Sequence, residues 1–129
     1  MTVFDTNMIL RYLIRDNEEQ ARQVMEILST DKALILPEVL AEVVYVLKNF
    51  YGCERNTITD TLTAFLSLDC ISADHKDVLL KCMELYKDTS LDFVDCLLCA
   101  YHIVLRYDIS TFDKKLNSLM KRTDEDTTT

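Results

Sequence analysis

Short apolar runs alternate with longer segments of helical periodicity along the whole chain. Four runs are typical of short strands, at residues 3–4, 33–36, 70–71 and 109–111. Each is followed by apolar residues at the spacing of an α-helix, and these helices begin at capping residues or, in one case, at Pro37. Strands that alternate with helices in this way predict an α/β fold with a parallel sheet.

Six or seven helical segments can be placed between these runs. The clearest covers residues 37–49, with Leu40 and Val44 on an apolar side and Tyr45 on the opposite side. The segment 91–106 is apolar nearly all round, which predicts a central, buried helix. We therefore expect a three-layer sandwich in which a short parallel sheet of about four or five strands is flanked by about six or seven helices.

The composition is that of one globular domain. The chain has 129 residues, 49% of them hydrophobic and 28% charged, with a single glycine and a single proline, so linkers are scarce. We expect one domain over residues 1–122 and a disordered polar tail over residues 123–129. The longest apolar run, residues 96–101, is too short to cross a bilayer, and the N-terminus lacks a secretory signal pattern. A soluble, cytoplasmic protein is expected.

Five cysteines, an odd number without regular spacing, predict reduced thiols. Cys96 and Cys99 form a Cys-x-x-Cys pair, but a zinc site would need a second pair, and a redox motif normally occupies an exposed turn. The pair lies in an apolar helical segment, which favours two core thiols.

The formal net charge of −8 argues against a nucleic-acid binder that relies on overall charge, because such binding needs Lys and Arg to neutralise phosphates. If the ligand is RNA, divalent cations held by acidic groups or a local basic patch must attract it.

Two aspartates, Asp5 and Asp113, directly follow predicted strands. Ligand sites of open parallel sheets form at the carboxyl ends of strands, where the next helix also begins. Asp is equally a preferred helix N-cap, so position alone leaves catalysis and capping open for both residues.

Asp95 lies at the start of the most apolar helix, where an ionised side chain is costly unless it is paired, capped or bound to a metal. Asp92, three residues earlier, is the natural cap and a candidate further ligand. Glu42 lies one turn after Glu38 on the polar side of helix 37–49, so periodicity alone places both at the solvated surface.

Four segments together resemble the PIN domain family, specifically the VapC-type toxins of toxin–antitoxin pairs. They are the opening Val-Phe-Asp-Thr-Asn, the helix segment from Leu36 that contains Glu42, the stretch Leu-Asp-Phe-Val-Asp-Cys-Leu-Leu-Cys-Ala from Leu91, and Ser-Thr-Phe-Asp-Lys-Lys-Leu from Ser110. They occur in the family's order over nearly the whole chain. Tyr107-Asp108 replaces the glycine usual in the family, and cysteines stand where alanines are frequent, but neither change touches the acidic positions.

The resemblance implies a metal-dependent endoribonuclease whose catalytic and metal-binding carboxylates are Asp5, Glu42, Asp95 and Asp113. Hard oxygen ligands without a His or Cys cluster select Mg²⁺ or Mn²⁺. One or two ions, about 3.5–4 Å apart if two, would activate a water that attacks the phosphorus. Asn7 and Thr111 could orient the ligands or this water, although both also fit as turn and cap residues.

The family further implies an RNA substrate, a cognate antitoxin protein and a homodimer, with Tyr12, Val24 and Tyr51 among candidate contacts. Six basic residues could hold RNA or simply form a solvated face: Arg11, Arg15, Lys114, Lys115, Lys121 and Arg122. His75 and His102 lack metal-ligand spacing and are expected to be structural.

Two other phosphate-handling folds fit less well. A response-regulator receiver needs an adjacent acidic pair after its first strand, and a haloacid-dehalogenase-type phosphatase needs Asp-x-Asp, whereas this chain has Asp5-Thr6-Asn7. The alternative from another class is a catalytically idle PIN-like module that only binds a protein partner.

Overall fold

The structure, a computed structural model, describes residues 1–128. The chain divides into two compact units, Met1–Lys76 and Asp77–Thr129. The first unit contains every strand found among the described residues, together with four helices, and the second is helical.

Three short parallel strands form the sheet of the first unit. They are β1 (Thr2–Val3), β2 (Ala33–Leu34) and β3 (Ile71–Ser72), in the order β1-β2-β3. In the register, Val3 lies opposite Leu34, and Leu34 lies opposite Ser72. Just past the paired residues, the Phe4 amide still donates to the Leu34 carbonyl at 3.2 Å. The predicted α/β class with a parallel sheet is confirmed.

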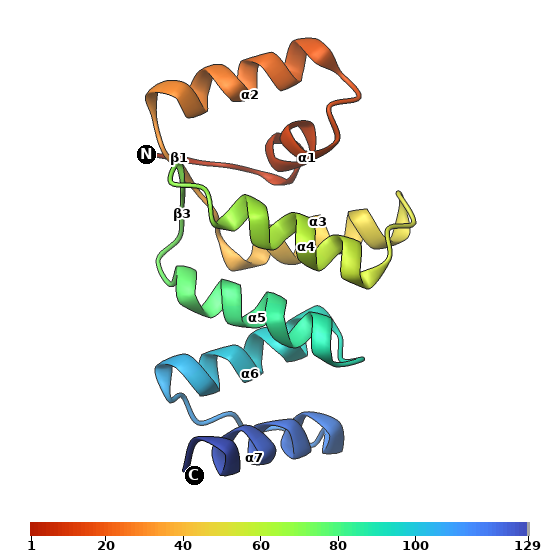
Figure 1. Cartoon of the computed structure of the whole chain (residues 1–129), viewed down its shortest axis with the longest axis vertical. Helices are drawn as coiled ribbons and strands as arrows, with labels where there is room; N and C mark the ends of the chain where they lie inside the picture. The colour runs from red at the N-terminus through yellow and green to blue at the C-terminus, as the bar shows by residue number, and fades with distance from the viewer. Residues whose placement is uncertain (129) are drawn as a thin grey trace. The chain divides into compact units, whose positions relative to one another are not determined.

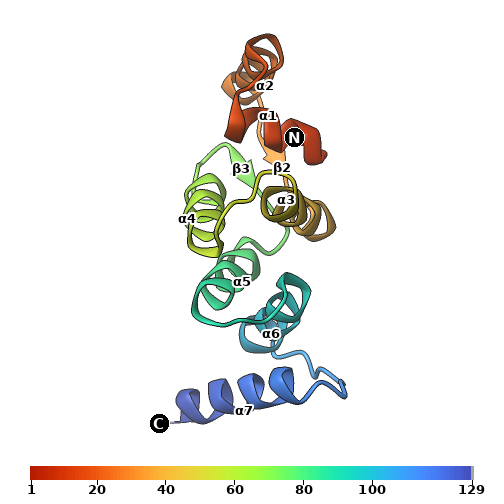
Figure 2. The same cartoon turned by 90° about the vertical axis from the view of Figure 1, so that its right-hand side faces the viewer.

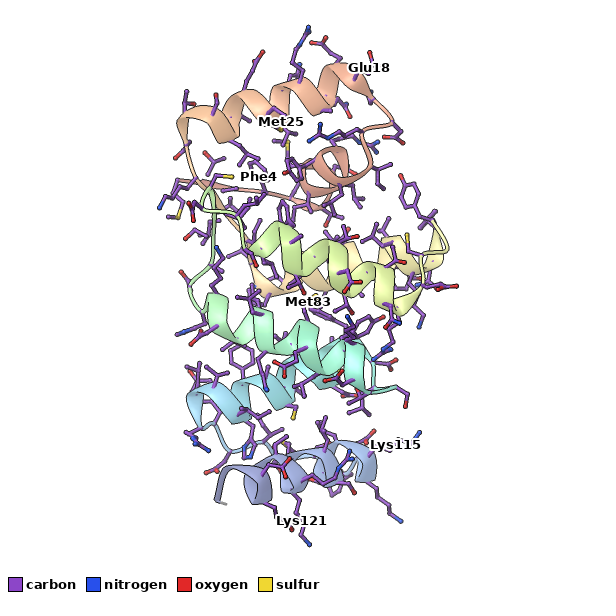
Figure 3. All side chains as sticks on the ribbon, in the orientation of Figure 1. Phe4, Glu18, Met25, Met83, Lys115 and Lys121 are labelled. Carbon is purple, nitrogen blue, oxygen red and sulfur yellow. The ribbon has the colours of Figure 1, made fainter. Side chains whose placement is uncertain are left out.

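Helices fill the connections between these strands, as a parallel sheet requires. The four helices of this unit are α1 (Thr6–Ile14), α2 (Glu18–Thr30), α3 (Pro37–Asn49) and α4 (Arg55–Leu66). Figures 1 and 2 show α1 and α2 toward one side of the strands and α4 toward the other. The core between them includes Phe4, which is labelled in Figure 3, and Leu40, both fully buried.

Local sequence rules explain most of these boundaries. Helix α3 has the predicted bounds, begins with Pro37 in its first turn and leaves Tyr45 62% exposed on its polar side. Helix α4 differs, because it begins at Arg55 and Glu54 occupies the N-cap without a side-chain bond, so the polar residues Asn56 and Thr57, which could cap a helix, lie inside its first turn. The helix starts earlier than its polar residues suggest.

Three helices make up the second unit: α5 (Lys76–Asp88, its first residue in the other unit), α6 (Phe93–Leu105) and α7 (Lys114–Thr128). Helices α6 and α7 pack against each other, as both views show (Figures 1 and 2). Helix α6 buries Phe93, Cys96, Cys99 and Ala100, but Val94 is 54% exposed. The prediction of a helix buried all round is therefore correct for one face only.

The seven helices of the described residues agree with the expected number, but the three strands fall short of the four or five that the sequence predicted. The missing one is the segment 109–111, which belongs to the second unit, where the described residues contain no strand that could complete a ladder with it. Its polar groups bond locally instead: the Thr111 carbonyl accepts from Asn117 Nδ2 at 2.9 Å, and Thr111 Oγ1 accepts from the Asp113 amide at 3.0 Å.

Helix α7 continues past residue 122 to Thr128. Residues 123–128, expected from their composition to form a disordered tail, are thus drawn as helix, and Thr129 lies outside the described residues. The position at which the domain ends stays a prediction.

The cysteines behave as core or half-buried thiols. All five are free, and Cys82, Cys96 and Cys99 are buried. Burial raises the pKa of Cys99 to about 11 and that of Cys82 further, so these thiols stay protonated at neutral pH. This agrees with the structural interpretation of the Cys-x-x-Cys pair. Within the described residues, no helix is both long and apolar enough to span a membrane.

His102 joins three segments of the second unit. Its Nδ1 lies 2.9 Å from the Tyr107 carbonyl oxygen, and its Nε2 lies 2.8 Å from Asp124 Oδ1 on α7. The Tyr107 ring also stacks on Tyr101 of α6, with the ring centroids 5.7 Å apart. The Tyr107 hydrogen bond raises the pKa of His102, burial opposes this, and Asp124 adds to the rise.

We predict that this contact makes the stability of the protein depend on pH. Because the folded pKa of His102 lies above its unfolded value of about 6.5, the contribution is complete below pH ~6.5 and is lost as pH rises through the folded pKa. In urea unfolding from pH 5.5 to 8.5, His102→Gln should destabilise the protein most at the acid end. His75→Gln, which alters the exposed second histidine, is the control and should show no such trend. Equal losses for His102→Gln at every pH would contradict the prediction.

Candidate functional site

Asp5 follows β1 directly and caps α1. Its backbone is extended, with φ −84° and ψ 179°, and its Oδ1 accepts a hydrogen bond from the Met8 amide at 2.9 Å. The capping role predicted as one alternative is therefore present. It uses one carboxylate oxygen only, and among the described residues no hydrogen bond occupies Oδ2. Capping and ligand binding are thus compatible at Asp5.

A cavity of about 170 Å³ opens beside Asp5. Its wall includes Asn7 and Arg11 of α1 and the amide side chains of Gln20 and Gln23 on α2. Arg11 also forms an ion pair with Asp16. Neither glutamine could be predicted from the sequence, because nothing in the local pattern of α2 indicates that this face lies beside Asp5.

Glu42 lies on the exposed side of α3, as periodicity predicted. Glu38, one turn earlier, is exposed as well, while the opposite side of the helix is buried through Leu40 and Val43. No hydrogen bond or ion pair of Glu42 occurs within the described residues, so its carboxylate is unconstrained. Within the first unit, Glu42 therefore makes no contact that would explain it as a stabilising residue.

Asp95 occupies the first turn of α6 and is half-buried. Burial raises its pKa, and the negative charges of Asp113 and Asp92 raise it further. Within the described residues its carboxylate has neither a hydrogen-bond donor nor a cationic partner. Only the positive end of the helix compensates the charge. The structure thus agrees with the prediction that an ionised side chain is costly at position 95.

Asp113 and Asp92 flank Asp95 but are held differently. Asp113 Oδ1 accepts from the Leu116 amide at 2.9 Å, which caps α7, and the Asp113 amide is bound by Thr111 Oγ1. Asp92 stands at the N-cap of α6 with its carbonyl bound by the Cys96 amide, but its side chain makes no capping bond. Asp92 thus occupies the predicted N-cap position but without the side-chain bond of a cap, and its carboxylate is available for another role.

The predicted site residues thus fall into two groups. Asp92 and Asp113 are close enough to Asp95 within the second unit to raise its pKa, while Asp5, Asn7 and Glu42 belong to the first unit. In the described part of the chain, no three His, Cys, Asp or Glu side chains are arranged to hold a metal ion. The chemistry of the donors nevertheless fits a hard divalent cation, since all are carboxylates and Asp95 carries uncompensated charge.

The chain is similar to known nucleases. Its residues 2–122 match the PIN domain family. A VapC ribonuclease of Aquifex aeolicus (strain VF5) is 30% identical over 101 residues, which cover 75% of this chain and 75% of that protein. No solved structure matches. The family match spans both structural units.

We predict that charge and capping can be separated at Asp5. Asn caps helices as well as Asp does, so Asp5→Asn should leave the free energy of unfolding within ~0.5 kcal/mol of wild type. Asp5→Ala removes the acceptor for the Met8 amide and should cost about 1 kcal/mol. Urea denaturation at pH 7 measures both values. An equal loss in the two variants would show that the carboxylate charge, not the cap, stabilises the helix.

At Asp95 we predict that loss of the charge does not destabilise the protein. A raised folded pKa means that the ionised carboxylate is destabilising, so stability is lost as pH rises from the unfolded pKa of about 3.9 through the folded pKa. Asp95→Asn removes this charge and should leave the protein at pH 7 as stable as wild type or more so, without added metal. Asp77→Asn, an exposed acid of α5 whose Oδ1 accepts from the Val78 amide, serves as control. A clear destabilisation by Asp95→Asn would mean that a contact of the carboxylate supports the fold.

Proposed function

The chain belongs to the PIN domain family, and on that premise we propose that it is a VapC-like, Mg²⁺- or Mn²⁺-dependent endoribonuclease that hydrolyses phosphodiester bonds of RNA. The ribonuclease relative of Aquifex aeolicus supports the nuclease activity. The observation that carries the proposal within this chain is Asp95, a half-buried carboxylate beside two further aspartates and without a protein partner among the described residues.

Uncompensated charge of this kind is typical of functional sites. A fold selected only for stability would pair Asp95 or replace it, because an unpaired, partly buried carboxylate costs free energy. A divalent cation would reverse the cost, since it would attract all three neighbouring carboxylates. Structural capping does not explain Asp92 or Asp95, as neither side chain makes a capping bond.

In this proposal the four carboxylates Asp5, Glu42, Asp95 and Asp113 are the ligands of one or two ions, with Asp92 as a candidate further ligand. When bound, the metal lowers the pKa of a water and neutralises phosphate charge. Thr111 Oγ1 accepts from the Asp113 amide and would thereby help to orient that carboxylate. Asn7, which lines the cavity beside Asp5, would orient the attacking water or the substrate phosphate.

Family membership also supports three proposals about partners and location: inhibition by a cognate antitoxin, a homodimer, and a cytoplasmic location. Of the candidate contacts, Val24 is excluded, since it is only 1% exposed and belongs to the core. Tyr51 is 43% exposed, while Tyr12 packs against Phe65 with the ring centroids 5.4 Å apart. A gel-filtration mass close to that of one chain would rule out the homodimer.

We predict that the purified protein cleaves members of a pool of structured RNAs when Mg²⁺ or Mn²⁺ is present and not in EDTA. Asp5→Asn and Asp95→Asn should each lower the rate at least ~100-fold, because each removes a charged ligand while the fold is kept. Gel analysis of end-labelled RNA measures the cleavage. Asp77→Asn is the matched control and should cleave like wild type.

A second measurement separates loss of metal binding from loss of chemistry. Mn²⁺ should raise the melting temperature of the wild type, because a ligand that binds only the folded state stabilises it. The shift should be smaller in Asp95→Asn. No cleavage beyond the level of the variants with either metal would sink the enzyme hypothesis and leave the idle protein-binding module as the better account.

A further inference from the structure

A groove of about 390 Å³ lies in the second unit, between the segment 88–91 that links α5 to α6 and one face of α7. The α7 side of the groove carries Lys114, Lys115, Ser118 and Arg122. Lys114, Ser118 and Arg122 are spaced four residues apart, so they share one helix face. Three cations thus line a single groove of a protein whose formal net charge is −8.

These cations form no ion pair in the described part of the chain. Several basic side chains elsewhere do: Arg11 pairs with Asp16, Arg22 with Glu19, and Lys81 with Glu84. Arg15 lies over the Tyr12 ring, 5.4 Å from its centroid. Lys114, Lys115 and Arg122 form no ion pair among the described residues, although Asp88 lines the same groove. The groove therefore has a local excess of positive charge, with three cations against the single carboxylate of Asp88, and the N-terminus of α7 adds to it.

The residues around Asp113 connect this groove to the candidate catalytic carboxylates. Asp113 immediately precedes Lys114 and Lys115, and on its other side stands Phe112, whose ring is fully exposed. An exposed aromatic ring beside a basic groove is the combination with which proteins bind single-stranded nucleic acid: cations hold the phosphates, and bases stack on the ring.

We propose that this basic groove binds the phosphodiester backbone of the single-stranded RNA substrate and that Phe112 stacks on a base of the same strand. The inference rests on the proposed ribonuclease function and deepens it, because it names the single-stranded region as the part of the RNA that is held. It also resolves the conflict between an acidic protein and a polyanionic ligand, since affinity comes from one patch and not from net charge.

The test measures binding without cleavage. A fluorescent single-stranded RNA 12-mer of mixed sequence is titrated with protein in EDTA, and anisotropy is followed from 50 to 200 mM salt. The triple variant Lys114→Gln/Lys115→Gln/Arg122→Gln should bind at least about 10-fold more weakly. Its log–log salt slope should be smaller by about 2, because each lost phosphate contact on a single strand removes about 0.7. Phe112→Ala should weaken binding about 10-fold with the slope unchanged.

Matched controls are available in the same chain. Lys32→Gln/Lys48→Gln/Arg106→Gln removes two lysines and one arginine, as the groove variant does, from exposed positions outside the groove. Phe50→Ala removes another exposed ring, on the first unit. Both controls should bind within about twofold of wild type, and circular dichroism verifies that all variants are folded.

Three results would contradict RNA binding by the groove. They are equal losses of RNA affinity in the two triple variants, no loss of affinity in the groove variant, or no RNA binding by the wild type at 50 mM salt. An oligoglutamate peptide that binds the groove more tightly than the RNA at the same salt would assign it to an acidic protein partner instead. Because these measurements exclude divalent metal, they stand apart from the cleavage assay. If the protein binds RNA in the groove but does not cleave it, the proposed nuclease activity is refuted. If the protein cleaves RNA and the groove variant binds RNA as wild type does, only the proposed role of the groove is refuted.

Discussion

The parallel sheet pairs only two residues in each strand, so it depends on the apolar side chains buried against it. Phe4, Ile35 and Ile71, which lie in the strands or directly after them, are at most 2% exposed. Burial of side chains of this size contributes about 1.5–3 kcal/mol each, more than so few ladder hydrogen bonds can supply. The same parallel register aligns the carboxyl ends of the strands, and that alignment places Asp5 and the start of α3 where the strands stop.

In the second unit, an ionised Asp95 lowers the stability of the fold. Asp95 is partly desolvated beside Asp92 and Asp113, and its raised pKa expresses the repulsion. Directly after Asp113 in the chain, α7 contributes to its groove three cations that form no ion pair within the described residues. Carboxylates and cations that do not pair with each other contribute little to stability. The carboxylates suit the binding of metal ions, and the cations suit the binding of phosphates. The proposed function gives one reason for both features.

Much of the fold and part of the site could be predicted from neighbouring residues. The bounds of α3 follow from Pro37 and the apolar spacing, and the caps at Asp5 and Asp113 follow from their positions before helices. The errors occurred where distant contacts override local preference. Val94 is 54% exposed in a helix whose sequence is apolar nearly all round, and the segment 109–111 has a strand-like sequence but no strand among the described residues of its own unit.

By itself, the sequence determined the alternation of strands and helices and the free state of the thiols, because periodicity, capping and residue chemistry are properties of short segments. The four carboxylates were predicted from the resemblance to the family, and their role stays a proposal. The sequence could not distinguish among six candidate cations. Only the tertiary structure decided that Arg11 and Arg15 are engaged within the first unit, while Lys114, Lys115 and Arg122 share a groove with the segment 88–91. The physical reason is that electrostatic compensation depends on distance in space, and residues far apart in sequence set that distance only after the chain has folded.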